Sequence, residues 1–468
     1  MMVFTERRQP ERSLGWLVVL VFIPVIGLGL FIAFGERMRT GRHLFKEAIR
    51  ESNQRETGTL DLSRERKIVE AELGEMRVEN PRMNTDRVLE LMTLLFKNNH
   101  AIAHAFNKIE LLSEPKQTFD SMWEALEGAT DHIHVEFFII DDDSTGRYLK
   151  EILCRKARAG LRVRVIYDYW GSRISKSYLK ELRESGVYVH SFFPPRFPFI
   201  LRHVNNRNHR KIIVIDGKTA FTGGLNVADR YRLGNSLGTW RDTMVRLQGP
   251  VVESLQEVFL ADWFFLERKP HLRQRYFPAL EKHEEGRNII QIVDSGPDTS
   301  YRAIMQGMIG MLNMATEYAY LQSPYFMPTS ELQEALIMTA LRGADVRLLL
   351  PKASDTSMAQ SGNASYLQPM LEAGVRVYWY VGGFLHSKTM VVDDYISTIG
   401  TSNMDFRSYE QNFEVNAFIY ERETALKLKA AFLRDLKSSR EISIEKWARR
   451  SKRMRFMEGI SRLFSPAM

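Results

Sequence analysis

The sequence has almost no cysteine: Cys154 is the one cysteine among 468 residues. A single thiol excludes an intramolecular disulfide framework and every multi-cysteine zinc or iron–sulfur site. The sequence also has no Walker loop and no GxGxxG fingerprint, so no motif predicts a bound nucleotide. Proline and glycine are sparse, with 16 and 29 residues, and 44% of the chain is apolar. These values exclude collagen-like, low-complexity and wholly disordered chains.

The length and composition of the sequence indicate a large, basic, globular chain. Its length suffices for two or three domain cores, and a chain of this size without disulfides fits a domain that faces the cytosol. The formal net charge of +8 favours an anionic partner, which means a phosphate-bearing substrate, a nucleic acid or an acidic lipid.

The longest apolar run lies near the N-terminus, where residues 13–35 include no charged side chain. A helix of this length spans roughly 34 Å, enough for a hydrocarbon core of ~30 Å. The run is too long for a cleaved signal peptide and lacks a small-residue cleavage site. We therefore expect a retained transmembrane helix after a short lead at 1–12. Three arginines precede the run and five basic residues follow it before residue 51, which favours a cytoplasmic location for the rest of the chain.

An internal repeat dominates the remaining sequence. From residue 119 onward, amphipathic helical segments alternate with apolar strands such as HIHVEFFII (132–140) and LRVRVIYD (161–168), a pattern typical of parallel strands with crossover helices. HRKIIVIDG (209–217) recurs as HSKTMVVDD (386–394), and GGLN (223–226) recurs as GTSN (400–403). The repeat predicts two pseudo-symmetric α/β lobes, each a mixed sheet flanked by helices.

The repeat also predicts the domain boundaries. We expect a charged helical connector at 36–110, the first lobe at 111–266, a polar connector at 267–289, the second lobe at 290–440 and a basic tail at 441–468. The first lobe has a longer loop before its histidine motif, and this loop includes FFPPRFPFILR (192–202). This loop has three equally supported interpretations: it forms a lid, it forms a rim that dips into a membrane, or it covers the core.

Each lobe contains one His-x-Lys-x4-Asp motif, for which composition predicts about 0.04 matches by chance. An asparagine follows each histidine by 17 positions. The candidate residues are His209, Lys211, Asp216 and Asn226 in the first lobe and His386, Lys388, Asp393 and Asn403 in the second. Because positions i and i+2 of a strand share a face, each histidine is expected beside its lysine.

Two such pairs, brought together by lobes that pack face to face, would surround one pocket with two imidazoles and two ammoniums. Imidazoles supply nucleophilic and acid–base chemistry near neutral pH, and lysines supply positive charge for phosphate oxygens. The asparagines would donate further hydrogen bonds to phosphate. This chemistry requires no metal, and His-x-Lys resembles no common metal-ligand spacing.

The acidic residues allow two interpretations. Asp216 and Asp393 fall where a hairpin turn is expected, so they either take part in catalysis or hold the turn. Asp242 in TWRDT and Glu414 in NFEV either orient an imidazole through a hydrogen bond or are ordinary surface acids.

The duplicated motif with its trailing asparagine resembles the phospholipase D superfamily. Within it, HVEFFI, GLRVRVIYD, SPYFMP, NFEVN and LFSPAM make the chain similar to the bacterial cardiolipin synthases over nearly its whole length. The resemblance implies an enzyme of the bacterial cell membrane that condenses two phosphatidylglycerol molecules to cardiolipin and glycerol. It implies no cofactor, no nucleotide and no nucleic-acid partner. Family members usually have two membrane spans, whereas this sequence shows one, and its first residues resemble the region just before the family's second span.

The resemblance also implies roles for the site residues. His209 would be the nucleophile that forms a phosphohistidine, and His386 the acid and base, although the near-symmetry of the lobes allows the reverse. Glu414 would orient His209, and Asp242 would orient His386, each across the lobe interface.

Other functions remain open from the sequence. A phospholipid hydrolase and a phosphatidylserine synthase-type transferase share the same motifs, a nuclease is disfavoured by a lipid anchor, and a membrane-anchored scaffold with an inactive site is the alternative from another class. The basic segment 446–462 either lies on an anionic leaflet or is a solvated surface helix.

Overall fold

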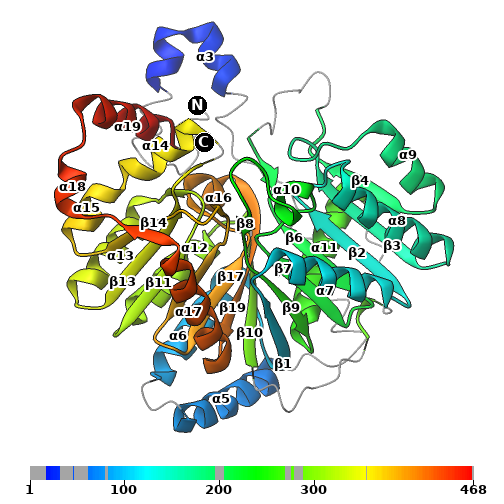
Figure 1. Cartoon of the computed structure of the whole chain (residues 1–468). Helices are drawn as coiled ribbons and strands as arrows, with labels where there is room; N and C mark the ends of the chain where they lie inside the picture. The colour runs from blue at the N-terminus through cyan, green and yellow to red at the C-terminus, as the bar shows by residue number, and fades with distance from the viewer. Residues whose placement is uncertain are drawn as a thin grey trace.

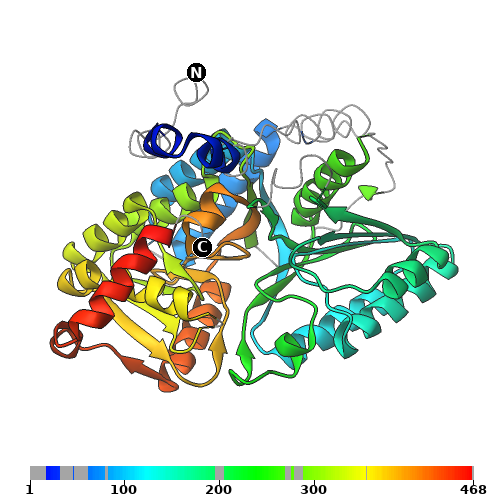
Figure 2. The same ribbon diagram turned by 90° about the horizontal axis from the view of Figure 1, so that it is seen from above.

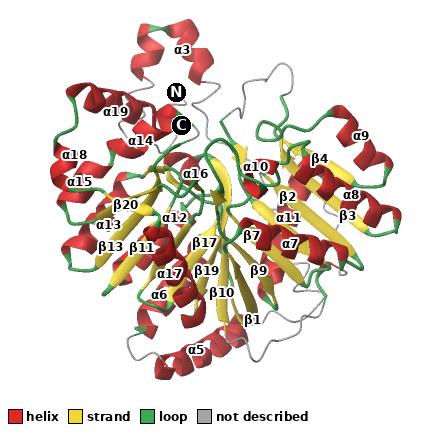
Figure 3. Cartoon of the chain, in the orientation of Figure 1, coloured by secondary structure: helices red, strands yellow, loops and turns green. Residues whose placement is uncertain are grey.

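The computed structural model describes residues 17–31, 46, 62–79, 83–195, 205–268, 276–278, 288–354 and 356–465. One sheet of sixteen strands runs through the described part of the chain, and helices flank it (Figure 1, Figure 3). Viewed from above, the two halves of the chain lie side by side (Figure 2). The predicted α/β architecture is therefore confirmed.

The two halves of the sheet repeat one strand order. The first half contains, in spatial order, β1 (Ala103–Leu112), β9 (Met244–Gln248), β7 (Thr219–Gly223), β6 (Lys211–Ile215), β2 (His132–Phe137), β3 (Arg162–Asp168) and β4 (Tyr188–Phe192). The second contains β10 (Asn288–Ser295), β19 (Asn412–Tyr420), β17 (Ile396–Gly400), β16 (Thr389–Val392), β11 (Tyr318–Gln322), β13 (Asp345–Pro351), β14 (Arg376–Tyr380) and the edge strand β20 (Ser439–Glu441). The parallel runs β2–β3–β4 and β11–β13–β14 fit the predicted crossover helices.

The halves meet through β1 and β10, which pair antiparallel at the centre of the sheet. The expectation that the lobes pack face to face is therefore wrong, since they join edge to edge. On its other side β1 pairs with β9, and β10 pairs with β19. Neither lobe therefore ends in an exposed edge strand at the junction.

Helices cover the sheet in the same order in both halves. In the first half they are α7 (Pro115–Glu127), α8 (Ser144–Arg158), α9 (Lys176–Glu184), α10 (Asp229–Arg232) and α11 (Val251–Glu267). In the second they are α12 (Ala303–Met314), α13 (Ser330–Leu341), α14 (Ser357–Ser365), α15 (Leu367–Glu372), α16 (Phe406–Glu410), α17 (Arg422–Lys437), α18 (Ile444–Ala448) and α19 (Lys452–Phe464). Asp143 caps α8 by accepting from the Gly146 amide, and Cys154 lies buried on the inner face of that helix.

The segment 36–110 is helical only in part. The structure has α5 (Leu62–Glu79) and α6 (Thr85–Asn99), but residues 103–110 belong to β1. The helical expectation is wrong there because pairing with β9 and β10, both distant in sequence, decides the conformation. The connector at 267–289 lies largely outside the described residues. Within it, Tyr276 is fully buried against His132 and His134.

Two expectations fall partly outside the described residues. Of the apolar run 13–35, the structure describes residues 17–31, which include α3 (Pro24–Leu30). None of the helices in the described ranges combines the length and apolar character needed to cross a membrane. Of the loop 192–202, residues 196–202 are not described. Its first residues, Phe192 and Phe193, pack against Phe413, so the described start of the loop covers the core.

Candidate active site

Two very short parallel strand pairs hold the site together across the lobe interface. In one, β5 (Arg207–Asn208) of the first lobe pairs with the start of β19 in the second. In the other, β15 (Phe384–Leu385) of the second lobe pairs with β8 (Trp240–Arg241) of the first. Both pairs end immediately before a histidine of the repeated motif.

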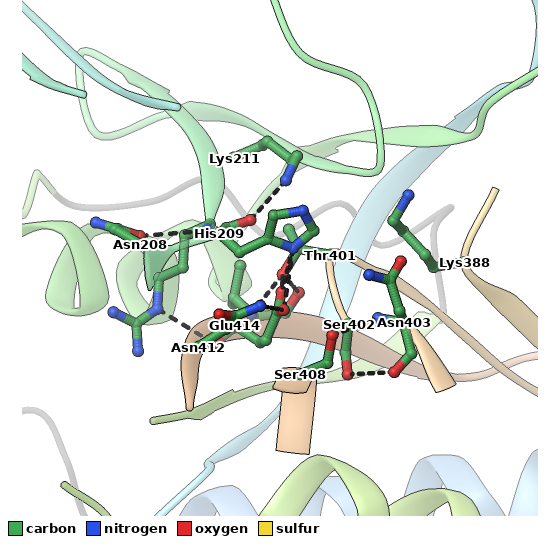
Figure 4. A network of polar contacts seen from close by, with 12 residues as sticks. Asn208, His209, Lys211, Lys388, Thr401, Ser402, Asn403, Ser408, Asn412 and Glu414 are labelled. Atoms are coloured by element: carbon green, nitrogen blue, oxygen red, sulfur yellow. Dashed lines mark hydrogen bonds and ion pairs between the residues drawn. The ribbon is translucent and has the colours of Figure 1, made fainter. Parts of the chain in front are cut away.

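The register of the first pair places His209 opposite Glu414. Asn208 faces Phe413, so the next residue on each strand comes into line, and the His209 amide donates to the Phe413 carbonyl at 2.9 Å. The imidazole Nδ1 lies 2.9 Å from Glu414 Oε2. Figure 4 shows the two side chains in contact, with Thr401 beside the carboxylate.

The second pair repeats this geometry with the lobes exchanged. Leu385 faces Arg241, and the His386 amide donates to the Arg241 carbonyl at 2.7 Å. His386 Nδ1 lies 2.6 Å from Asp242 Oδ2. The structure therefore brings each histidine to the carboxylate that the sequence paired with it, in each case a residue of the other lobe.

Each carboxylate is held by a different set of donors. Glu414 accepts from the Thr401 hydroxyl at 2.5 Å and from the Asn412 amide at 3.3 Å. Asp242 accepts from the Thr243 backbone at 2.7 Å. A β-carbon on Gly224 would lie 2.1 Å from Asp242 Oδ1, so only glycine leaves room for this carboxylate.

The two lysines are buried beside their histidines. Lys211 Nζ donates to the His209 carbonyl and Lys388 Nζ to the His386 carbonyl, both at 2.6 Å. Lys388 Nζ also lies 3.2 Å from His386 Nε2. The charge of Lys388 acts on His209 and that of Lys211 acts on His386, so the two histidine–lysine pairs face one shared site.

Burial sets the protonation of this site. It lowers the pKa of His209 to about 4, against the opposing charge of Glu414. Burial, aided by the charge of Lys388, lowers the pKa of His386 to about 3, although Asp242 opposes the shift. Burial also holds the pKa of Lys211 well below its usual value. Without an anion, the site therefore contains neutral imidazoles and costly ammonium charges.

The neutral imidazoles have a defined orientation. Burial raises the pKa of Glu414, but the interaction with His209, which includes a hydrogen bond, and the charge of Lys211 more than offset this, and the net shift is downward. An ionised Glu414 accepts the Nδ1–H of His209 and leaves the Nε2 lone pair directed away from the carboxylate. This is the arrangement that an imidazole nucleophile requires.

The two asparagines differ in their surroundings. The Asn226 side chain is fully buried, accepts from the Ile139 amide and donates to the Tyr231 hydroxyl at 2.7 Å. Asn403 lies next to Lys388 (Figure 4), and its Oδ1 is buried without a hydrogen-bond partner in the described structure. Asn403 Oδ1 is therefore an unused acceptor, whereas a phosphate oxygen would take its hydrogen bond from the Asn403 Nδ2 amide.

The structure separates the two motif aspartates from the histidines. Asp216 accepts from the amides of Thr130, Asp131 and His132 at the start of β2. It follows β6, whose five residues put it about 17 Å beyond Lys211. Asp216 holds this turn at a φ of 54°, which corresponds to the turn-holding alternative.

Asp393 repeats these contacts in the second lobe. Its carboxylate accepts from the amides of Thr316, Glu317 and Tyr318 at the start of β11, and its φ is 48°. Among the described residues, neither aspartate forms a hydrogen bond with His209 or His386, whose Nδ1 atoms bind Glu414 and Asp242 instead.

Aromatic side chains that the sequence analysis did not select enclose the histidines. The ring centroids of Tyr231 and Trp240 lie 5.4 Å and 5.2 Å from that of His386, and Phe138 lies 4.9 Å from His209. The sequence could have predicted Trp240, because this residue precedes Asp242 by two positions and side chains two positions apart in an extended chain point to the same side.

Known proteins resemble this chain over most of its length. Residues 122–263 and 308–436 match the family described as "Cardiolipin synthase, PLD-like domain", and residues 2–36 match "Phospholipase_D-nuclease N-terminal". A cardiolipin synthase of Listeria monocytogenes serotype 4a is 39% identical, with 100% of this chain and 95% of the relative covered. One from Staphylococcus aureus strain Mu50 is 38% identical, with 100% and 93% covered.

A solved structure shows the same fold. The phosphatidylserine synthase of Haemophilus influenzae superposes with a TM-score of 0.63 at 14% identity, covering 81% of this chain and 100% of its own.

Proposed function

Since the chain belongs to the family of phospholipase D-like cardiolipin synthases, we propose that it joins two phosphatidylglycerol molecules into cardiolipin and releases glycerol. The observation that carries this proposal is the pair of buried imidazoles, each held at Nδ1 by a carboxylate of the other lobe and accompanied by a buried lysine.

In the first half-reaction, His209 Nε2 attacks the phosphorus of one phosphatidylglycerol. The phosphorus–oxygen bond to the glycerol headgroup breaks, and His386 gives a proton to the departing oxygen. His386 has this proton because the phosphodiester anion raises the pKa of a nearby imidazole. The lysines and Asn403 donate hydrogen bonds to the phosphoryl oxygens as charge develops there.

In the second half-reaction, a hydroxyl of the second phosphatidylglycerol attacks the phosphohistidine. His386 removes the hydroxyl proton, the phosphorus–nitrogen bond breaks and cardiolipin leaves. One phosphodiester replaces another, so the equilibrium lies near unity and no nucleotide is consumed. The aromatic rings around the histidines restrict water, whose attack would give phosphatidate instead.

We infer further that the enzyme works at the bacterial cell membrane. The uncharged run 13–35 is long enough to span it, and the basic residues after the run favour cytoplasmic lobes. Helix α19 exposes Met454, Phe456 and Met457 among basic residues and lies at the same end of the molecule as α3 (Figure 1). This tail suits an anionic leaflet.

The test uses purified full-length protein in phosphatidylglycerol vesicles without nucleotide or added metal. We expect cardiolipin and glycerol in equal amounts from the wild type, none from His209→Ala, and wild-type rates from His190→Ala, which changes a partly exposed histidine on β4. Phosphatidate in place of cardiolipin would identify a hydrolase. No turnover by the wild type would identify an inactive scaffold.

A further inference from the structure

The extended segment that leads into β6 presents two cationic side chains and one imidazole on one side. Arg207, His209 and Lys211 alternate with Asn208 and Arg210, and strand alternation puts the two sets on opposite faces. The second set is buried: Asn208 donates to Glu136, and Arg210 forms an ion pair with Asp262. Arg207 therefore shares the side of the segment that forms the site.

The second lobe has no counterpart of Arg207. The residue two positions before His386 is Phe384 of β15, which is fully buried. Its ring packs on that of Trp240, with the ring centroids 4.5 Å apart. The pseudo-symmetric site is thus asymmetric in charge, with an additional guanidinium at the His209 side only.

A second guanidinium on that side also departs from the symmetry. Arg407 is the second residue of α16 in the second lobe, and its counterpart in the first lobe is Arg230, the second residue of α10. Arg230 forms an ion pair with Asp141 at 2.6 Å. No carboxylate of the described residues lies within 4.0 Å of a guanidinium nitrogen of Arg407 or Arg207. Arg407 instead donates to the Asn205 carbonyl at 3.2 Å and Arg207 to the Asn206 carbonyl at 3.1 Å.

The two guanidiniums lie near each other, because they donate to the backbone carbonyls of the adjacent residues 206 and 205. Burial lowers the pKa of Arg207 to about 10; Asp168 opposes this shift, and the charge of Arg407 adds to it. Burial also lowers the pKa of Arg407, and the charges of Asp405, Asp168 and Glu414 oppose this shift. Among the described residues neither guanidinium forms an ion pair, and the charges of Asp168 and Asp405 reach Arg407 only from a distance. An anion that joins these two half-buried like charges would therefore stabilise them.

We propose that Arg207 and Arg407 bind the phosphodiester of the acceptor phosphatidylglycerol, while the lysines hold the phosphate that is transferred. This inference rests on the proposed function, since an acceptor lipid brings a second phosphate that needs its own cations. Guanidinium forks match phosphate oxygens in geometry. Trp170, 44% exposed and 5.7 Å from Arg207, lies beside the pair and suits the membrane interface.

The experiment compares two acceptors for one phosphohistidine. Full-length enzyme in phosphatidylglycerol vesicles with labelled glycerol forms cardiolipin from the lipid acceptor and labelled phosphatidylglycerol from glycerol, which has no phosphate. For Arg207→Gln and Arg407→Gln, we expect the ratio of cardiolipin to labelled phosphatidylglycerol to fall at least tenfold. Arg232→Gln, at an exposed arginine of α10, should keep the wild-type ratio.

An unchanged ratio would overturn the proposal, whether both products persist or both fall together, because the arginines would then not distinguish the acceptors. Inhibition by inorganic phosphate that depends on Arg207 while the ratio is unchanged would assign the pair to free phosphate and overturn the lipid assignment. A wild type that forms neither product would refute the proposed function itself, which separates that failure from failure of the subsite.

Discussion

Replacing His209 by Gln should make the protein less sensitive to acid. At pH 7.5 the imidazole is neutral in both the folded and the unfolded chain and adds no pH dependence. Below pH 6.5 the unfolded chain takes up a proton that the buried imidazole, with its pKa of about 4, refuses. Stability is therefore lost as the pH falls from 6.5 toward 4, and Gln, which keeps a donor for Glu414, removes this loss.

The pKa values give the magnitude. At about pH 5 the unfolded imidazole is protonated and the folded one is not. The unfolded chain gains this proton over the interval from about pH 6.5 to pH 5, which is roughly 1.5 pH units. At 1.36 kcal/mol per unit, the loss of stability is about 2 kcal/mol. His386, with a pKa of about 3, contributes a similar amount. His209→Gln should thus lower the difference in unfolding free energy between pH 7.5 and 5 by about 2 kcal/mol.

Urea unfolding of the full-length protein in detergent, followed at both pH values, measures this difference. The matched control is His190→Gln, whose side chain is 37% exposed on β4. The reasoning is refuted if His209→Gln loses as much stability on acidification as the wild type does, since the folded imidazole would then accept a proton as readily as the unfolded one.

Three further predictions follow from the site. Glu414→Gln and Asp242→Asn should each lower kcat for cardiolipin formation at least a hundredfold with little change in melting temperature, because they remove the charge that orients an imidazole; equal activity would exclude this role. Asp216→Ala should lower the unfolding free energy by about 2 kcal/mol through lost turn hydrogen bonds, while kcat measured at low temperature stays within a few-fold of wild type. Gly224→Ala should abolish turnover by displacing the Asp242 carboxylate, whereas Gly74→Ala, which meets no atom within 4 Å, should be silent.

The repeated lobes could be predicted from the sequence because local patterns encode them, whereas the pairing of each histidine with a carboxylate of the other lobe was implied only by the family resemblance. Alternating apolar strands and amphipathic helices give β2 and β3 within a few residues of the expected bounds. The duplicated motif identifies His209 and His386. The two acids stand at different distances downstream, 33 residues after His209 and 28 after His386, so the repeat alone does not select them. The interpretation of Asp216 stayed open because the sequence does not show which backbone amides its carboxylate meets.

Long-range pairing accounts for what the sequence missed. Strand β1 lies in a charged segment with helical neighbours, and only its partners β9 and β10 fix it as the centre of a continuous sheet. Strands β5, β8 and β15 have two residues each, too few for any periodic signal. Arg207, by contrast, was within reach, since it alternates with His209 and Lys211 in the sequence.

The central claim is that both histidines act on one phosphorus atom through a phosphohistidine. The direct measurement is rapid quenching of the enzyme during turnover of phosphatidylglycerol labelled with ³²P, followed by peptide mapping of the protein-bound label. The account predicts an acid-labile label on His209 in the wild type that disappears in His209→Ala. In His386→Ala, which lacks both the acid of the first half-reaction and the base of the second, the label should form and decay more slowly. Cardiolipin formation by His209→Ala, or turnover without protein-bound label in any variant, would contradict it.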